Sequence, residues 1–230
     1  MTVEEELEPE LEVALEEVEF FRSLSPDRLQ LVRQQLRERR YPRRKALFRE
    51  GQPAEFLWAL RAGEVRILKT SGDGRVLALE TIRPGEIFGA VAALEGTAYP
   101  ASAETTTEST IWRLSRTALL ALVRQDPGLS REILAIIARR LRGAHVRLRS
   151  VAYDPAEVRL AQALLHAAQQ DEATVTRREL AETAGTTVET AIRVMRRFER
   201  EGLVRGEVNH IVILDARSLR RLAGEEPAGS

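Results

Sequence analysis

The chain has 230 residues with 35 basic and 35 acidic side chains, so its formal net charge is zero. A hydrophobic fraction of 43% is enough for folded cores in one or two domains, and no apolar run is long enough to cross a bilayer. The absence of cysteine excludes disulfides, cysteine-ligated iron–sulfur clusters and cysteine nucleophiles. Because the N-terminus is acidic where a signal peptide would be basic, we expect a cytoplasmic protein with no membrane partner.

The acidic residues are concentrated at the N-terminus. Residues 1–19 contain nine Glu and no Lys or Arg, whereas the other residues carry 35 basic against 26 acidic side chains. We treat 1–19 as a separate acidic segment. Its apolar residues recur at helical spacing and are Leu7, Leu11, Ala14, Leu15 and Val18. Ser25 followed by Pro26 then predicts the start of another helix, which runs to about Arg37.

From residue 41 to residue 112 the apolar pattern has a period of two, in short runs separated by glycine, which predicts β-strands. The predicted strands are 46–48, 56–60, 65–68, 76–82 and 110–114. Turn sequences lie at 71–74 and 83–86. Short strands at this spacing predict a compact antiparallel barrel or roll, which we assign to residues 20–125.

A long helix is predicted after Asp126 and Pro127. Its apolar residues follow the a/d spacing of a coiled-coil seam and are Leu134, Ile137, Leu141, Ala144, Leu148 and Val151. Because arginines occupy the flanking positions, this narrow stripe favours two chains packing side by side as a homodimer. The alternative is that the stripe packs against its own domain. We assign residues 126–153 to this dimerisation helix and to a hinge before Pro155.

Residues 176–200 predict a helix-turn-helix. Thr176 followed by Glu179 is the pattern of a capping box, and Gly185 supplies the positive φ that a tight turn requires. Thr187 then caps a second helix, whose inward stripe consists of Ala191, Val194, Met195 and Phe198. Apolar runs at 202–204 and 211–214 predict a β-hairpin wing, so residues 154–224 form a winged helix-turn-helix, followed by a tail at 225–230.

The face of the second helix opposite the inward stripe carries Glu189, Arg193, Arg196 and Arg200. A recognition helix places its N-terminal half in the major groove of DNA. There Arg193 can donate to the O6 and N7 atoms of guanine, and Glu189 can accept from the N4 amine of cytosine. The residues predicted to contact phosphates are Thr176, Arg177, Thr187 and Arg196.

The alternative for these arginines is a solvated face that is paired with Glu199 and Glu201. Residues 154–224 contain eleven Arg and eleven acidic residues, so the domain lacks the basic excess that is usual in a DNA-binding domain. The prediction of DNA binding therefore rests on how the charges are arranged.

From about Phe20 to Leu222 the chain resembles the CRP/FNR family of transcription regulators. Gly51 and the glycine-containing segments 63–65 and 84–89 resemble the framework of the cyclic-nucleotide-binding β-roll. The sequence of residues 187–193, TVETAIR, resembles the TVETISR pattern of the FNR branch. The resemblance implies an α+β fold with an N-terminal double-stranded β-roll, a long dimerisation helix and a C-terminal winged helix-turn-helix.

The resemblance also implies a role for particular residues. Val188, Glu189 and Arg193 would contact bases in a half-site that contains TGA, with Ile192 in place of the family's serine. A twofold symmetric dimer would bind a palindromic site in double-stranded DNA, with half-sites roughly 10 to 11 base pairs apart. The family resemblance further implies an activator that contacts RNA polymerase.

The effector pocket departs from the cyclic AMP-binding members of the family. Those members follow Phe-Gly-Glu with an Arg-Ser pair that neutralises the cyclic phosphate. The corresponding positions here are Gly89, Ala90, Tyr99 and Pro100, together with Ser102, which a shifted alignment would place at the serine. Because a buried phosphate without its arginine is costly, we expect DNA binding without a small-molecule effector. The alternative is an effector-dependent regulator that binds cyclic nucleotide or another small ligand in the roll.

We expect no cofactor and no metal. The iron–sulfur cluster of the FNR branch needs cysteines, and residues 1–144 contain no histidine for a haem or for a metal in a cupin-like enzyme. His145, His166 and His210 are each isolated, and no Ser-His-Asp arrangement or phosphate-binding glycine loop is present, so we predict that the protein is not an enzyme. A regulator whose C-terminal domain binds a protein is a further alternative, which the salt dependence of DNA binding would distinguish.

Overall fold

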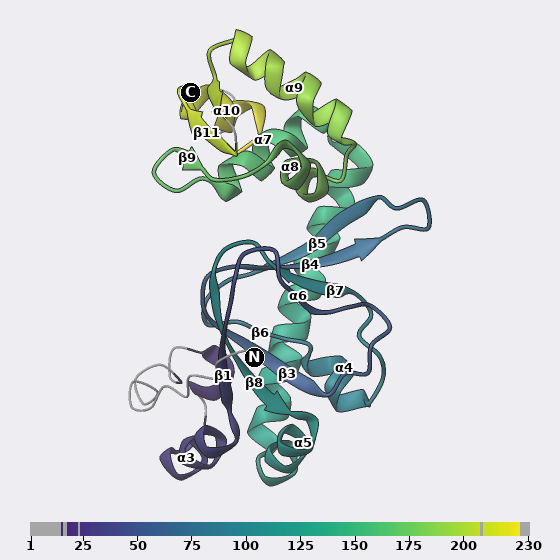
Figure 1. Cartoon of the computed structure of the whole chain (residues 1–230), viewed down its shortest axis with the longest axis vertical. Coiled ribbons are helices and arrows are strands. Elements are labelled where there is room, and N and C mark those ends of the chain that lie inside the picture. The colour runs from purple at the N-terminus through teal and green to yellow at the C-terminus, as the bar shows by residue number, and fades with distance from the viewer. Residues whose placement is uncertain (1–14, 16–17, 23, 208, 226–230) are drawn as a thin grey trace. The chain divides into compact units, whose positions relative to one another are not determined.

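The computed structural model describes residues 15, 18–22, 24–207 and 209–225 (Figure 1). The chain divides into two compact units, which are residues 1–74 with 79–141 and residues 75–78 with 142–230. Of the apolar stripe predicted near the N-terminus, Leu7, Leu11 and Ala14 lie outside the described residues, whereas Leu15 and Val18 are buried in the core of the first unit.

Two four-stranded sheets form the roll. One has the order β1 (Arg37–Tyr41), β8 (Ser109–Ser115), β3 (Phe56–Ala62), β6 (Ile87–Phe88), and the other has the order β2 (Ala46–Phe48), β7 (Ser102–Thr105), β4 (Val65–Thr70), β5 (Val76–Ile82). Because strands far apart in sequence are neighbours in both sheets, the chain crosses repeatedly between them, as a β-roll requires. The predicted β-roll is confirmed, although β1, β6 and β7 were not among the predicted strands.

The two predicted turns of the roll are confirmed. The N–H of Gly74 donates to the carbonyl of Ser71 at 2.9 Å, between β4 and β5. The N–H of Glu86 donates to the carbonyl of Arg83 at 3.1 Å, and Gly85 between them has a φ of 88°. Positive φ costs glycine little, which explains why these turns are visible in the sequence.

The helices of this part of the chain are α2 (Glu19–Arg22), α3 (Pro26–Gln35), α4 (Ala90–Glu95), α5 (Arg116–Gln125) and α6 (Pro127–Tyr153). The predicted extension of the second helix to Arg37 was wrong, because α3 ends at Gln35 and Arg37 begins β1. The long helix after Asp126 is confirmed as α6. Its first turns lie on the roll through Leu129 and Ile133, which are buried in the same core as Phe88 and Trp112.

The C-terminal part of the chain is a small helical domain with a three-stranded sheet in the order β10, β11, β9. Its elements are α7 (Ala156–Ala167), β9 (Glu172–Ala173), α8 (Arg177–Ala184), α9 (Val188–Arg200), β10 (Val204–Glu207), β11 (His210–Ile213) and α10 (Ala216–Leu222). The predicted wing is confirmed as β10 and β11, with strands a few residues closer to the turn than predicted. The short β9, which pairs with β11, was not predicted.

No helix in the described parts of the chain is long and apolar enough to span a bilayer.

Candidate DNA-binding surface and effector pocket

The first helix of the helix-turn-helix, α8, begins with the predicted capping box. The Glu179 N–H donates to Oγ1 of Thr176 at 3.1 Å, and the Thr176 N–H donates to the Glu179 carboxylate at 2.7 Å. These two bonds satisfy backbone donors that have no partner within the helix. The cap therefore fixes where α8 starts and which way its first residue, Arg177, projects.

The turn between α8 and α9 also follows the prediction. Gly185 ends α8 in the left-handed conformation, with a φ of 61°. The Thr190 N–H then donates to Oγ1 of Thr187 at 3.2 Å, which caps α9. Because both helix ends are set by local bonds, the positions at which α8 ends and α9 begins are determined by the sequence of the turn.

One side of α9 is buried in the core of the C-terminal domain. The predicted inward residues Ala191, Val194, Met195 and Phe198 are all buried, against Leu160, Leu164 and Leu180 among others. Burying large apolar side chains at this period orients the helix strongly, since a rotation about its axis would expose Phe198. The opposite side of α9 must therefore face outward.

That outward side is a charged groove. It is lined by Glu189, Ile192, Arg193, Arg196, Glu199 and Arg200. Arg193, Arg196 and Arg200 are exposed, and within the described residues the structure records no ion pair or hydrogen bond for any of the three. Their guanidinium groups are therefore available to an outside partner.

Two acidic residues near the C-terminal end of this face are paired with arginines outside it. Glu199 accepts from Nη2 of Arg177 on α8 at 2.7 Å, and Glu201 lies 3.7 Å from Nε of Arg197. Arg197 also pairs with Glu157 of α7. The described residues thus offer no support for pairing of the outward arginines with Glu199 and Glu201.

The other residues predicted to contact DNA have differing surroundings. Val188 is half-buried against the domain core, so only part of its side chain is presented outward. The Thr187 hydroxyl donates to Oγ1 of Thr190 at 3.1 Å, a bond that a phosphate would have to replace. Arg177 is 27% exposed beside Glu199, which itself lines the groove, so it lies at the groove's border. Thr176 is half-buried at the start of the same helix.

The apolar stripe of α6 is not the face that packs on the roll. Leu134, Ile137, Leu141, Ala144, Leu148 and Val151 are all exposed, the large residues to between 37% at Ile137 and 68% at Leu148. The helix contacts the roll through other positions, Leu129, Ile133 and Ile136. A row of exposed apolar side chains of this size lowers its free energy when it is covered, because each removes apolar surface from water.

In the roll, Tyr99 belongs to a cluster of aromatic side chains. Its ring stacks on Phe48 with centroids 3.8 Å apart, and Trp58 stacks on Phe88 at 6.1 Å. The Tyr99 hydroxyl donates to the carbonyl of Phe56 at 2.9 Å and accepts from the indole N–H of Trp58 at 3.0 Å. Burial raises the pKa of Tyr99 above its ordinary value of 10.0, because the phenolate would lose its hydration. Tyr99 is thus a residue of the core of the roll, and its hydroxyl is already hydrogen-bonded within that core.

The other predicted pocket positions surround this cluster or lie outside it. Gly89 has a φ of 72°, and a side chain there would approach Trp58 and Tyr99 to 3.1 Å. Ala90 is buried beside it at the start of α4, whereas Pro100 is exposed. Ser102 accepts from the N–H of Glu50 at 3.0 Å. Gly89 and Tyr99 are therefore brought together, but Ser102 is bonded to a loop and Pro100 has no role in the cluster.

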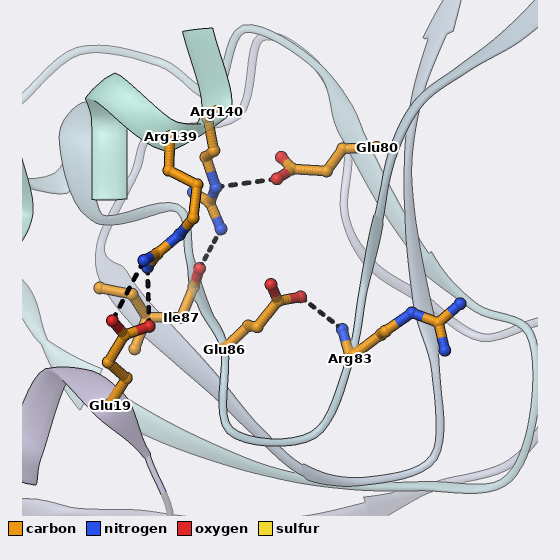
Figure 2. A network of polar contacts seen from close by, with 7 residues as sticks. All are labelled: Glu19, Glu80, Arg83, Glu86, Ile87, Arg139 and Arg140. Atoms are coloured by element: carbon orange, nitrogen blue, oxygen red, sulfur yellow. Dashed lines mark hydrogen bonds and ion pairs between the residues drawn. The ribbon is translucent and has the colours of Figure 1, made fainter. Parts of the chain in front are cut away.

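Two arginines of α6 reach the roll (Figure 2). Nε of Arg140 lies 2.9 Å from the Glu80 carboxylate of β5, and its Nη2 donates to the carbonyl of Ile87 in β6. Arg139 makes two bonds, at 2.7 and 3.1 Å, to the Glu19 carboxylate of α2. Arg140 is half-buried, so its charge is held by an internal carboxylate and a carbonyl. The sequence placed both arginines only as charged flanks of the apolar stripe, and their contacts with the roll were not predicted, because their partners are far away along the chain.

No group of three or more potential metal ligands is found among the residues that the structure describes. His210 lies 3.6 Å from the Glu172 carboxylate, a contact within the small sheet of the C-terminal domain.

Comparisons with known proteins agree with this architecture. A family model described as "Cyclic nucleotide-binding domain" matches residues 38–126, and one described as "Crp-like helix-turn-helix domain" matches residues 158–222. The chain is 32% identical over 207 residues to the "Cyclic AMP receptor protein" of Thermus thermophilus, which covers 89% of this chain and 96% of that protein. It is 28% identical over 214 residues to the "CRP-like cAMP-activated global transcriptional regulator" of Mycobacterium tuberculosis, with the same coverage of both chains.

Among solved structures, a CRP-family transcriptional regulator from Thermus thermophilus is similar with a TM-score of 0.72 at 27% identity, covering 81% of this chain and 96% of that chain. The fold and the charged helix define a transcriptional regulator that joins a sensor-type β-roll to a helix-turn-helix. The chain belongs to the CRP/FNR family.

Proposed function

We propose that the protein is a homodimeric, sequence-specific DNA-binding regulator that works in the cytoplasm without a small-molecule effector. The outward face of α9 carries this proposal, because Arg193, Arg196 and Arg200 project from it with no ion pair recorded among the described residues. Three cations on one face of a rigid helix suit the phosphate oxygens and guanine edges of a major groove.

Within that surface, Val188, Glu189 and Arg193 are proposed to contact bases, because they lie in the N-terminal half of α9. The proposed phosphate contacts are Thr176, Arg177, Thr187 and Arg196. A protein ligand for the same face is the competing possibility, and it would not produce the counterion release that accompanies phosphate binding.

The homodimer is proposed from α6. A stripe that runs from Leu134 to Val151 and is exposed along its length is the type of surface that a second copy of the same helix covers. We retain residues 126–153 as the dimerisation helix and hinge, between the roll at 20–125 and the DNA-binding domain at 154–224. Two copies related by a twofold axis would bind a palindromic site.

Regulation without an effector is proposed from the interior of the roll. Tyr99, at the position where the cyclic AMP-binding members resembled by this chain have an arginine, fills an aromatic cluster, and the charge of Arg140 is already held by Glu80. An anionic ligand that used Arg140 would have to displace that carboxylate, which is costly.

Control by a cyclic nucleotide is the second candidate. The match of residues 38–126 to the cyclic nucleotide-binding domain favours it, as does the name of the Thermus thermophilus relative, a "Cyclic AMP receptor protein". A role as an activator that contacts RNA polymerase is likewise proposed from the family, in which one relative from Pseudomonas aeruginosa is named "Transcriptional activator protein anr".

The proposed DNA binding is tested by selecting bound duplexes from a random pool with the purified full chain, followed by a salt titration on the selected site. Two proposed phosphate-contacting arginines per protomer, Arg177 and Arg196, give four per dimer. The slope of log K against log salt concentration should then be about −3.6 or steeper. Recovery of no preferred duplex, or affinity that is insensitive to salt, would refute DNA binding through this face.

A further inference from the structure

Three elements of the DNA-binding domain meet at one ion pair. Arg177 is the first residue of α8, Glu199 is in the last turn of α9, and Gly206 is in strand β10 of the wing. Nη2 of Arg177 donates to Oε1 of Glu199 at 2.7 Å. The pair therefore joins the first helix to the recognition helix on the side where the wing begins.

Gly206 lies directly against this pair. A Cβ atom added at Gly206 would lie 2.2 Å from Nη2 of Arg177 and 2.3 Å from Oε1 of Glu199, well inside contact distance. Gly206 has the strand conformation of β10, paired with Ile211, and the atoms that a Cβ would meet are the ends of two flexible side chains, so a larger residue there would displace the ion pair. The backbone of β10 at Gly206 thus lies directly against the guanidinium and the carboxylate, and we call it the floor of the ion pair. Its position restricts the torsions of both side chains.

The pair leaves most of the guanidinium free to act. Glu199 takes a bond from Nη2 only, and the structure records no bond from Nε or Nη1 of Arg177 to any described residue. Arginine has five N–H donors in a planar fork, so a guanidinium held at one nitrogen still presents others in a defined direction. A free arginine would lose the freedom of several torsions when it binds a phosphate, whereas a held one has lost much of it beforehand.

We propose that Glu199 is a positioning residue that holds Arg177 ready to contact the DNA backbone, with Gly206 as the floor of the arrangement. This proposal rests on the proposed DNA-binding function. Glu199 does not contact the phosphate in this account. Its carboxylate lowers the electrostatic attraction of the surface for DNA and contributes by keeping the guanidinium in one orientation.

The two effects of Glu199 are separated by comparing Glu199→Gln with Glu199→Ala. Both substitutions remove the negative charge, and both introduce residues with high helix propensity. Only glutamine keeps a side-chain oxygen that can accept from Nη2 of Arg177. A difference in DNA affinity between these variants therefore reports the hold on Arg177 and not the change in charge.

The experiment measures the affinity of both variants for the selected duplex by fluorescence anisotropy, alone and in combination with Arg177→Ala. We expect Glu199→Ala to bind about two- to tenfold more weakly than Glu199→Gln per half-site, the affinity equivalent of ordering one long side chain. In the Arg177→Ala background the two variants should bind equally, because the residue on which Glu199 acts is absent. Thermal unfolding of each variant checks that the domain stays folded.

Equal affinity of Glu199→Ala and Glu199→Gln with Arg177 present would overturn the proposal. A difference that persists in the Arg177→Ala background would also overturn it, because Glu199 would then act by another route. Failure of the proposed function gives a separate result, in which the unsubstituted protein selects no duplex at all.

Discussion

The substitution Tyr99→Phe removes one hydroxyl group from the roll and tests whether that hydroxyl stabilises the core of the roll. In Tyr99→Phe the ring still stacks on Phe48, but the hydrogen bonds of the hydroxyl are lost. The indole N–H of Trp58, a bond of 3.0 Å in a buried location, is left without its acceptor, and the carbonyl of Phe56 loses a donor at 2.9 Å. The Phe56 N–H loses a weaker bond at 3.3 Å.

The size of the effect follows from these partners. A buried donor that loses its only partner costs about 1 to 3 kcal/mol, and a half-buried carbonyl costs less because water can reach it. We therefore expect Tyr99→Phe to lower the free energy of unfolding of the roll by about 2 to 4 kcal/mol. The phenylalanine is smaller by one oxygen, so packing contributes little to this loss.

Urea unfolding followed by tryptophan fluorescence measures this quantity in the correct part of the molecule. The chain has two tryptophans, Trp58 and Trp112, and both lie in the core of the first unit. Tyr153→Phe is the matched control, because the Tyr153 side chain is 81% exposed on α6. If Tyr99→Phe lowers the free energy of unfolding by no more than the control substitution does, the proposed stabilisation of the roll by the Tyr99 hydroxyl is refuted.

Three further predictions concern DNA binding, pH and assembly. Arg193→Ala should weaken specific binding by about 1 to 3 kcal/mol per half-site and relax the preference at one base pair, which a binding assay over duplex variants would show; an equal loss on random DNA would contradict base contact. Because burial raises the pKa of Tyr99 above 10.0, the folded roll keeps that proton longer than the unfolded chain, so its stability is present below about pH 10 and falls above it. Urea unfolding of Tyr99→Phe should show a smaller alkaline loss than the unsubstituted protein, and parallel curves would remove Tyr99 as the cause. Leu141→Glu with Leu148→Glu places charges in the exposed stripe of α6 and should convert a dimer to monomer in sedimentation analysis, whereas a dimer that survives would place the interface elsewhere.

The helix-turn-helix was predictable because its signals are local. The capping box at Thr176, the left-handed turn at Gly185 and the period of the stripe that ends at Phe198 each depend on residues within four positions of one another. Such local patterns can be recognised in the sequence without knowledge of the fold.

Strand β1 was missed for the opposite reason. Its sequence, RERRY, has four charged residues in five and no apolar alternation. It pairs with β8, and the Glu38 carboxylate accepts from the indole of Trp112 at 2.6 Å, across 74 positions of the chain. A partner so distant leaves no trace in a local pattern, and tertiary context overrides propensity in such a strand.

The same limit applies to the site residues. The sequence indicated that Tyr99 departs from the family's pocket, but its role in the core depends on Phe56 and Trp58, more than forty positions away. Glu199 was considered in the sequence only as an alternative partner for the outward arginines, whereas the structure pairs it with Arg177, 22 positions away on the other helix. Which arginine a carboxylate meets depends on the crossing of α8 and α9, which their separate sequence patterns do not specify.

We propose that the protein binds specific DNA with no ligand in the roll. The most direct test of this proposal is the affinity of protein purified free of nucleotides for a selected duplex, measured without and with saturating cyclic AMP, and repeated with other cyclic nucleotides. We expect specific binding with a Kd of about 10⁻⁸ M or tighter in the absence of ligand, unchanged by any nucleotide added. Binding that appears only when a cyclic nucleotide is present would contradict it.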